Sequence, residues 1–121
     1  MVQTTAKITE ALKILEDTIL DHMDIPKTVF HKRAIDYFIN NQHPINERLL
    51  IRKRLDPLYV KKSALEQFIL DDKRSNEVVR LAEEYGCGKT ILLFQILLDY
   101  CCAIAPAVLD EKLLQSFGLI D

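Results

Sequence analysis

Three polar side chains near the start of the chain could form hydrogen bonds with the edges of nucleic-acid bases. If residues 2–8 are extended, alternation places Gln3, Thr5 and Lys7 on one face of the strand. A glutamine can bond adenine with two hydrogen bonds, a lysine can donate to guanine, and a threonine can bond a base edge or contact the thymine methyl. The intervening residues are small or apolar, which suits a face that rests on helices. The same residues also fit an exposed, disordered N-terminus.

Two Lys-Thr pairs stand where a helix is predicted to begin. The first, Lys27 and Thr28, follows Pro26, a residue suited to the first turn of a helix. The second pair is Lys89 and Thr90. The N-terminus of a helix presents unpaired N–H groups and a partial positive charge, so both positions are candidate anion sites. The alternative is ordinary helix capping by the threonines.

The segment 42–63 is the most basic part of the chain, with six Lys and Arg against two Asp and Glu. Residues 46–55 are predicted to be helical, and Pro57 follows soon after the predicted helix end. Arg48 and Arg52 are spaced to share one face of that helix. They are therefore a second candidate for phosphate contact. The alternative is a solvated helix face.

The other chemistry-bearing residues do not form a recognisable site. No partner at metal-ligand spacing accompanies the histidines His22, His31 and His43. Residues 86–90 resemble part of a phosphate-binding P-loop, but Glu83 stands where that motif requires glycine. The carboxylates are scattered along predicted helices as on solvated faces, and no nucleophile with a base can be identified. We therefore predict no catalytic residue, no metal and no cofactor, and expect that the protein is not an enzyme.

Two similar successions of elements position these residues. Apolar residues recur at helical spacing from Ile8 to Met23 and again from Phe30 to Phe38, with a short polar strand before them and a break between them. A window 62 positions further along, residues 70–101, repeats the order, with its break at residues 86–88. Its preceding strand would be residues 65–69. The alternative is a plain helical bundle whose stripes align by chance.

This order resembles the ribbon-helix-helix family of DNA-binding proteins, the Arc and MetJ type. The family carries a strand, an amphipathic helix, a turn, a hydroxyl residue and a second helix with an Ala-Ile step. Here Thr28 is the hydroxyl residue, and Ala34 with Ile35 is the step. Two copies in one chain resemble the plasmid-mobilisation accessory proteins that carry two such motifs.

The resemblance implies roles for the polar residues. Gln3, Thr5 and Lys7 match the positions that contact base edges, and the start of each second helix, at residues 27–28 and 89–90, matches a clamp on backbone phosphates. The second copy departs from the family, because Leu65, Gln67 and Ile69 occupy its base-contacting positions and two of them are apolar. Either the register of the second strand slips, or the second strand pairs but contacts few bases, which would make the ribbon and its DNA site asymmetric.

Charge and cysteine content restrict the function classes only weakly. The net charge is −2, but residues 1–63 carry eleven Lys and Arg against eight acids, and residues 64–121 carry five against ten. The three cysteines, of which Cys101 and Cys102 are adjacent, do not suggest a disulfide framework. The chain starts without a charged-then-apolar signal segment. We expect a cytoplasmic protein.

The sequence predicts a mostly α fold, a tandem ribbon-helix-helix with a short two-stranded antiparallel ribbon and about six helices. The predicted parts of one compact domain are a first copy (1–41), a basic helical connector (42–63), a second copy (64–105) and a C-terminal helix (106–121). The expected function is sequence-preferring binding of double-stranded DNA, as a transcriptional repressor or a plasmid or mobile-element regulator.

The alternative is an antitoxin-like or other protein-interaction module with little or no DNA binding. The apolar run 90–109 would then hold a protein partner or a second copy of the chain. That run approaches the length of a membrane span, but Gln95, Asp99 and Pro106 lie within it, so we predict a buried helix and no membrane association.

Overall fold

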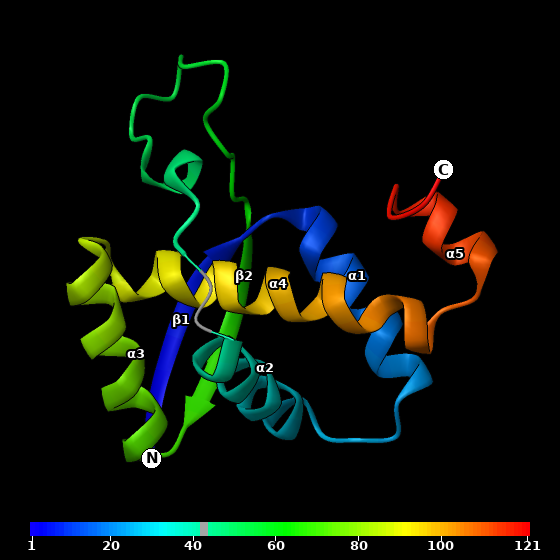
Figure 1. The fold of residues 1–121 in the computed structure, drawn as a ribbon, viewed down its shortest axis with the longest axis horizontal. Coiled ribbons are helices and arrows are strands. Elements are labelled where there is room, and N and C mark those ends of the chain that lie inside the picture. The colour runs from blue at the N-terminus through cyan, green and yellow to red at the C-terminus, as the bar shows by residue number, and fades with distance from the viewer. Residues whose placement is uncertain (42–43) are drawn as a thin grey trace.

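Two strands from distant parts of the chain pair on one side of the molecule, and the five α-helices all lie to one side of this pair (Figure 1). The computed structural model describes residues 1–41 and 44–121, so His43 lies outside the described residues. The elements are β1 (Val2–Ile8), α1 (Glu10–His22), α2 (Lys27–Asn41), the 3₁₀ helix η1 (Glu47–Leu50), β2 (Ala64–Leu70), α3 (Asp72–Tyr85), α4 (Lys89–Val108) and α5 (Glu111–Ser116). The described chain is thus mostly helical, as predicted.

The strands β1 and β2 pair antiparallel within the chain, which confirms the predicted ribbon. Thr5 lies opposite Gln67, and the ladder runs from the pair Val2–Leu70 to the pair Ile8–Ala64. Thr5 and Gln67 are 62 positions apart. Every other pair of the ladder maps onto another pair under the same shift, so the ribbon has an approximate two-fold axis through its centre.

The helices follow the same 62-residue spacing. Each strand and α-helix of the first half begins 62 positions before one of the second half: β1 and β2 at Val2 and Ala64, α1 and α3 at Glu10 and Asp72, and α2 and α4 at Lys27 and Lys89. The caps also correspond, since the side chain of Thr9 accepts a hydrogen bond from Leu12 N and that of Asp71 accepts one from Arg74 N. Residues 62 positions apart are called counterparts below.

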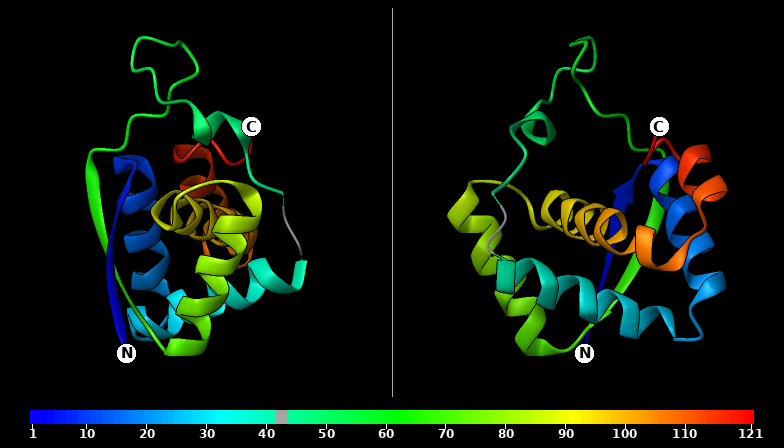
Figure 2. Two further views of the ribbon diagram at one scale, coloured as in Figure 1. Left: turned by 90° about the vertical axis from the view of Figure 1, so that its left-hand side faces the viewer. Right: turned by 45° about the vertical axis from the view of Figure 1, so that its right-hand side comes forward.

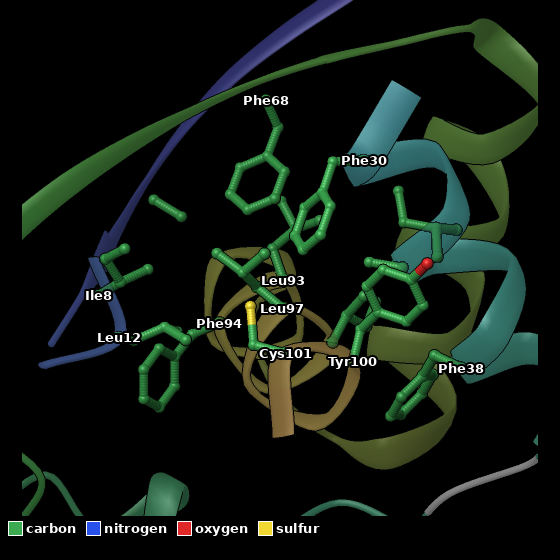
Figure 3. Packing of buried hydrophobic residues seen from close by; sticks show 14 of the residues in the cluster. Ile8, Leu12, Phe30, Phe38, Phe68, Leu93, Phe94, Leu97, Tyr100 and Cys101 are labelled. Atoms are coloured by element: carbon green, nitrogen blue, oxygen red, sulfur yellow. The ribbon is translucent and has the colours of Figure 1, made fainter. Parts of the chain in front are cut away.

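The core forms around α4, which crosses the inner face of the ribbon, in front of the strands in Figure 1, and contacts β1, α1, α2 and α3. Leu93, Leu97 and Cys101 point from α4 toward Phe30 of α2 and Phe68 of β2 (Figure 3). Such close packing of large apolar side chains is the main source of stability in a domain of this size.

Most of the residues predicted for the core are in it. Ile19, Ala34, Phe38, Ile96 and Leu97 are buried. Met23, Leu81 and Tyr85 are only partly buried and pack at its edge.

We expect Ile96→Val to lower the free energy of unfolding by about 0.5–1.5 kcal/mol, because one methylene is removed from a fully buried helical site. The matched control is Ile14→Val, which removes the same group from a helical residue that is 58% exposed. That change should stay within about 0.5 kcal/mol of wild type. Equilibrium unfolding in urea measures both, and equal losses would show that α4 is not the centre of the core.

The helix α4 is long and apolar enough to cross a membrane by length and composition, the only such helix in the described part of the chain. Nine of its twenty residues are buried among the other elements. This is the pattern of a central core helix, and it agrees with the predicted buried helix.

The predicted helix over residues 46–55 is wrong. Of the segment 44–63, only Glu47–Leu50 is helical, as one 3₁₀ turn, and the rest forms a loop that extends away from the helices (Figure 1). Leu49 is buried, but Leu55 is 98% exposed, so the segment has no apolar stripe to pack. Adjacent cations at residues 52–54 also disfavour a helix.

The C-terminal boundary also differs from the prediction. α4 continues past Pro106 to Val108, where the prediction ended it at residue 105. The predicted last helix is short, because α5 starts only after Asp110, whose side chain accepts a hydrogen bond from Leu113 N at 2.8 Å.

Candidate nucleic-acid interface

The outer face of the ribbon is directed away from the helices (Figure 2). On β1 the side chains of Gln3, Thr5 and Lys7 are exposed, and the residues between them are buried. On β2, Leu65 and Gln67 are exposed in the same way. The alternation predicted from the sequence is therefore present on both strands. Four polar or charged groups and two apolar ones, the second being Ile69, share one outward surface.

The first turns of α2 and α4 lie on opposite flanks of this ribbon. Thr28 lines a hollow together with Gln67 and Ile69 of β2. Thr90 lines another hollow with Thr5 and Lys7 of β1. Thr28 and Thr90 are counterparts, and so are the strand residues beside them. The approximate two-fold axis thus relates the two flanks.

The start of α4 suits an anion better than the start of α2 does. Gly88 precedes α4 and supplies no side-chain cap, so the first N–H groups lack the acceptor that Thr9 and Asp71 give to α1 and α3. Lys89 has no salt bridge within residues 1–41 and 44–121. By contrast, the ammonium of Lys27 lies 3.1 Å from a carboxylate oxygen of Glu66.

A basic hollow adjoins the Lys7 end of the ribbon. It is lined by Lys7, Arg54, Tyr59, Lys61 and Lys62. The Lys62 ammonium also lies 5.6 Å from the centre of the Phe94 ring, and burial lowers the pKa of Lys62. The charge of the connector is therefore held beside one half of the ribbon.

The predicted pair Arg48 and Arg52 does not form a common face. Arg48 follows the first residue of η1, and its Nε donates to the carbonyl oxygen of Leu58 at 2.7 Å. Arg52 lies beyond η1 in the loop and is exposed. The prediction failed because it required a longer helix.

Behind the ribbon lies a buried charged cluster that the sequence analysis missed. His31 Nε2 is 2.9 Å from Glu16 Oε2 and 3.1 Å from Glu66 Oε2, and the three side chains are at most 1% exposed. Lys13 and Lys27 cover its edge, with Lys13 Nζ 2.6 Å from Glu66 Oε1. The cluster joins α1, α2 and β2.

In this cluster the pKa values of Glu16 and His31 are raised, whereas that of Glu66 is lowered. Burial raises the pKa of Glu16, with a further contribution from Glu66 and opposition from His31. Burial also acts to raise the pKa of Glu66, but hydrogen bonds with His31, Glu16, Lys13 and Lys27 outweigh it and lower the pKa. Burial acts to lower the pKa of His31, yet the two carboxylates raise it. These shifts favour a negative charge on Glu66 and a positive charge on His31.

A periodicity signal could have revealed the cluster. Glu16 falls on the same helical stripe as Leu12 and Ile19, and His31 falls on the stripe of Ala34 and Phe38. Glu66 occupies an inward position in the alternation of β2. The expectation that the carboxylates on helices are solvated was wrong for Glu16.

Comparison with protein-family models, with curated proteins and with solved structures found no match to this chain.

Proposed function

We propose that the chain is a double-stranded DNA-binding protein with two ribbon-helix-helix copies, acting as a transcriptional repressor or a plasmid or mobile-element regulator. The observation that carries the proposal is the antiparallel ribbon, whose polar outer face is flanked by the starts of two long helices. The common 62-residue spacing of strands, helices and caps supports the tandem arrangement. In this arrangement one chain supplies both strands of the ribbon.

The ribbon supports contact with base edges in the major groove. That groove admits a two-stranded ribbon, and each base pair presents a distinct pattern of donors and acceptors there. Gln3, Thr5 and Lys7 from β1 and Gln67 from β2 are exposed and share the outward face. Because Leu65 and Ile69 supply no hydrogen bonds, the preferred DNA site would be asymmetric.

The flanking helix starts support phosphate contact, and the two flanks differ in strength. Thr90 is exposed and shares a hollow with Lys62, and Lys89 forms no salt bridge with the residues that the structure describes. On the other flank Thr28 is exposed, but the amine of Lys27 is held by carboxylates. We therefore propose that Lys89 contributes more to phosphate binding than Lys27.

Loss of a base contact and loss of a phosphate contact should have different effects on DNA affinity and sequence discrimination. We expect Gln3→Ala or Lys7→Ala to cost about 1–3 kcal/mol on the preferred duplex and to reduce discrimination against other sequences. Lys89→Ala should weaken binding to all sequences alike and lower the salt slope by about one. Lys27→Ala should change the slope less. Fluorescence anisotropy titrations on selected and scrambled duplexes at two salt concentrations measure these effects.

A wild-type chain that binds no duplex even at low salt would refute the proposal, because the phosphate contribution is greatest there. Equal losses for Lys7→Ala and Lys89→Ala on every sequence would leave DNA binding in place but remove the base-contact role of the ribbon.

The main alternative is a protein-interaction module that uses the apolar run 90–109. The packing disfavours it, because α4 contacts β1, α1, α2 and α3 and its large apolar side chains are buried or half-buried among them. An antitoxin-like partner would need a different surface of the chain.

A further inference from the structure

Three potential metal ligands converge behind the ribbon. Glu16 Oε2 and Glu66 Oε2 lie 2.9 Å and 3.1 Å from His31 Nε2, and the three residues each offer a ligand atom within 4.8 Å of the others. We propose that Glu16, His31 and Glu66 bind one divalent transition-metal ion of the zinc type. This site is independent of the proposed DNA binding.

The two lysines at the edge leave the converging oxygens free. Lys13 Nζ lies 2.6 Å and Lys27 Nζ 3.1 Å from Glu66 Oε1, and Lys27 Nζ lies 3.3 Å from Glu16 Oε1. All three distances are to Oε1 atoms, whereas the Oε2 atoms are directed toward His31. The lysines thus orient the carboxylates from outside, as outer hydrogen-bond partners do in metal sites.

The second carboxylate oxygen of Glu16, which is not the one directed toward His31, is unsatisfied. Glu16 is fully buried, and its Oε1 has no hydrogen-bond partner among the described residues. The Lys27 ammonium is at ion-pair distance from this oxygen but not in hydrogen-bond geometry. Buried polar atoms without partners are uncommon in folded proteins and call for a missing ligand. An ion beside Glu16 would supply one, either directly or through a bound water.

The spacing of the ligand atoms suits such an ion. Two ligands about 2.0 Å from a tetrahedral zinc ion are about 3.3 Å from each other. The present N–O distances need to lengthen only slightly to reach that value, as the Nε2 proton of His31 leaves. One imidazole nitrogen with two carboxylates favours zinc-type ions over Mg²⁺ and Ca²⁺, which prefer oxygen ligands alone.

An entry path reaches the cluster from the surface. A pocket of about 360 Å³ is lined by His31 and Glu66, with Lys27, Thr28 and Gln67 at its rim. A fourth coordination position, left open by three protein ligands, would face this pocket and could hold water.

The fold does not require charged residues at this place. The counterparts of Glu16, His31 and Glu66 in the other half are Val78, Leu93 and Thr4, and they occupy the equivalent buried positions. Uncharged residues therefore suffice to pack this junction of two helices and a strand. Burying ions is costly unless they are well compensated. Packing alone therefore does not explain why the first half carries charged residues at these positions.

The test is calorimetric titration of the metal-free chain with Zn²⁺. We expect one ion per wild-type chain and at least a hundredfold weaker binding after Glu16→Val, His31→Leu and Glu66→Thr, the exchange for the counterpart residues. His22→Gln is the matched control, because it removes an exposed histidine outside the cluster and should bind as wild type does. Circular dichroism establishes that each variant is folded.

A second measurement needs no variant. In a chain with ¹⁵N-labelled histidine, Zn²⁺ should shift the ring nitrogen Nε2 of His31 and leave His22 unchanged. Replacement by Co²⁺ should give visible absorption without the intense ultraviolet band of thiolate ligands. Binding that survives the triple exchange, that shifts another histidine, or that shows thiolate absorption would overturn the proposal, as would a wild-type chain with no bound Zn²⁺.

Discussion

His31→Leu alone is expected to lower the free energy of unfolding by about 3–5 kcal/mol, and the triple exchange of Glu16→Val, His31→Leu and Glu66→Thr is expected to restore it. The single change removes the group that lies between two buried carboxylates. Removing one partner of a buried ionic group leaves an uncompensated charge, which costs about 3–5 kcal/mol.

The lysines cannot replace the imidazole. Lys13 and Lys27 are 32% and 37% exposed, and their amines contact the carboxylates from the rim, on the Oε1 atoms. The Oε2 atoms of Glu16 and Glu66 would be left facing each other across the space of the lost ring. One carboxyl would have to bind a proton, or the cluster would have to open to water.

The triple exchange introduces residues that already occupy the equivalent buried positions in the other half of this chain. Val78, Leu93 and Thr4 pack the equivalent junction, and Leu93 is 1% exposed there. Replacing a buried ionic set with packed apolar residues is commonly neutral or stabilising. The energies of the single changes should therefore be strongly non-additive, the signature of residues in one network.

Urea unfolding of the wild type, His31→Leu and the triple exchange, with a chelator present, measures these effects. If His31→Leu costs less than about 0.5 kcal/mol, the cluster is not an electrostatic unit. If the triple exchange is as unstable as the single one, the two halves do not pack alike.

The difference in stability between the wild type and the triple exchange is expected to depend on pH. The pKa of His31 is raised above 6.5 in the folded chain, so its contribution is complete below that pH and is lost as the pH rises through the folded pKa. The pKa of Glu16 is also raised, and its contribution is lost in the same direction. Glu66 acts oppositely, because its pKa lies below 4.5 and its contribution is lost on acidification.

We therefore expect wild type to lose stability relative to the triple exchange as the pH rises above 6.5, and also on strong acidification. Unfolding in urea over a pH series checks this, and a constant difference across the series would contradict it.

The sequence predicted those features that depend on local periodicity. Alternation placed Gln3, Thr5 and Lys7 outside, and the shift of 62 positions located the partner strand. The helical stripes located α1 to α4, because a period of three to four apolar residues describes a helix wherever it packs.

The connector and the cluster were not predicted. Periodicity marks the three cluster residues as inward-facing, but only tertiary packing shows that they meet and that the connector is not helical. Helical spacing of Arg48 and Arg52 says nothing about whether a core exists for that segment to pack on. Glu16, His31 and Glu66 are 15 to 50 positions apart in the chain. Only the pairing of β2 with β1 and the crossing of α1 and α2 behind it bring them together.

Lys7→Glu combined with Lys89→Glu is expected to weaken binding to DNA at least about a hundredfold. Lys7 is exposed on the outer face of the ribbon, and Lys89 opens the helix on its β1 flank. Loss of a base contact costs about 1–3 kcal/mol, and loss of a phosphate contact lowers affinity for every sequence. Each reversal also adds a negative charge that the phosphates repel. The salt slope should fall by about two.

The matched control is Arg80→Glu combined with Lys112→Glu, which changes the net charge equally. Arg80 lies on α3 beside Glu77 and Glu84, and Lys112 is exposed on α5, so neither belongs to the ribbon surface. Lys62 is left unchanged because its ammonium packs over Phe94, and its reversal would disturb the fold.

Anisotropy titration at several salt concentrations compares the two pairs, with thermal unfolding to establish that both remain folded. If both pairs weaken binding alike, only net charge matters and the ribbon has no special role. If only Lys7→Glu with Lys89→Glu weakens DNA binding, the DNA contacts lie on the side of the molecule that carries the outer face of the ribbon.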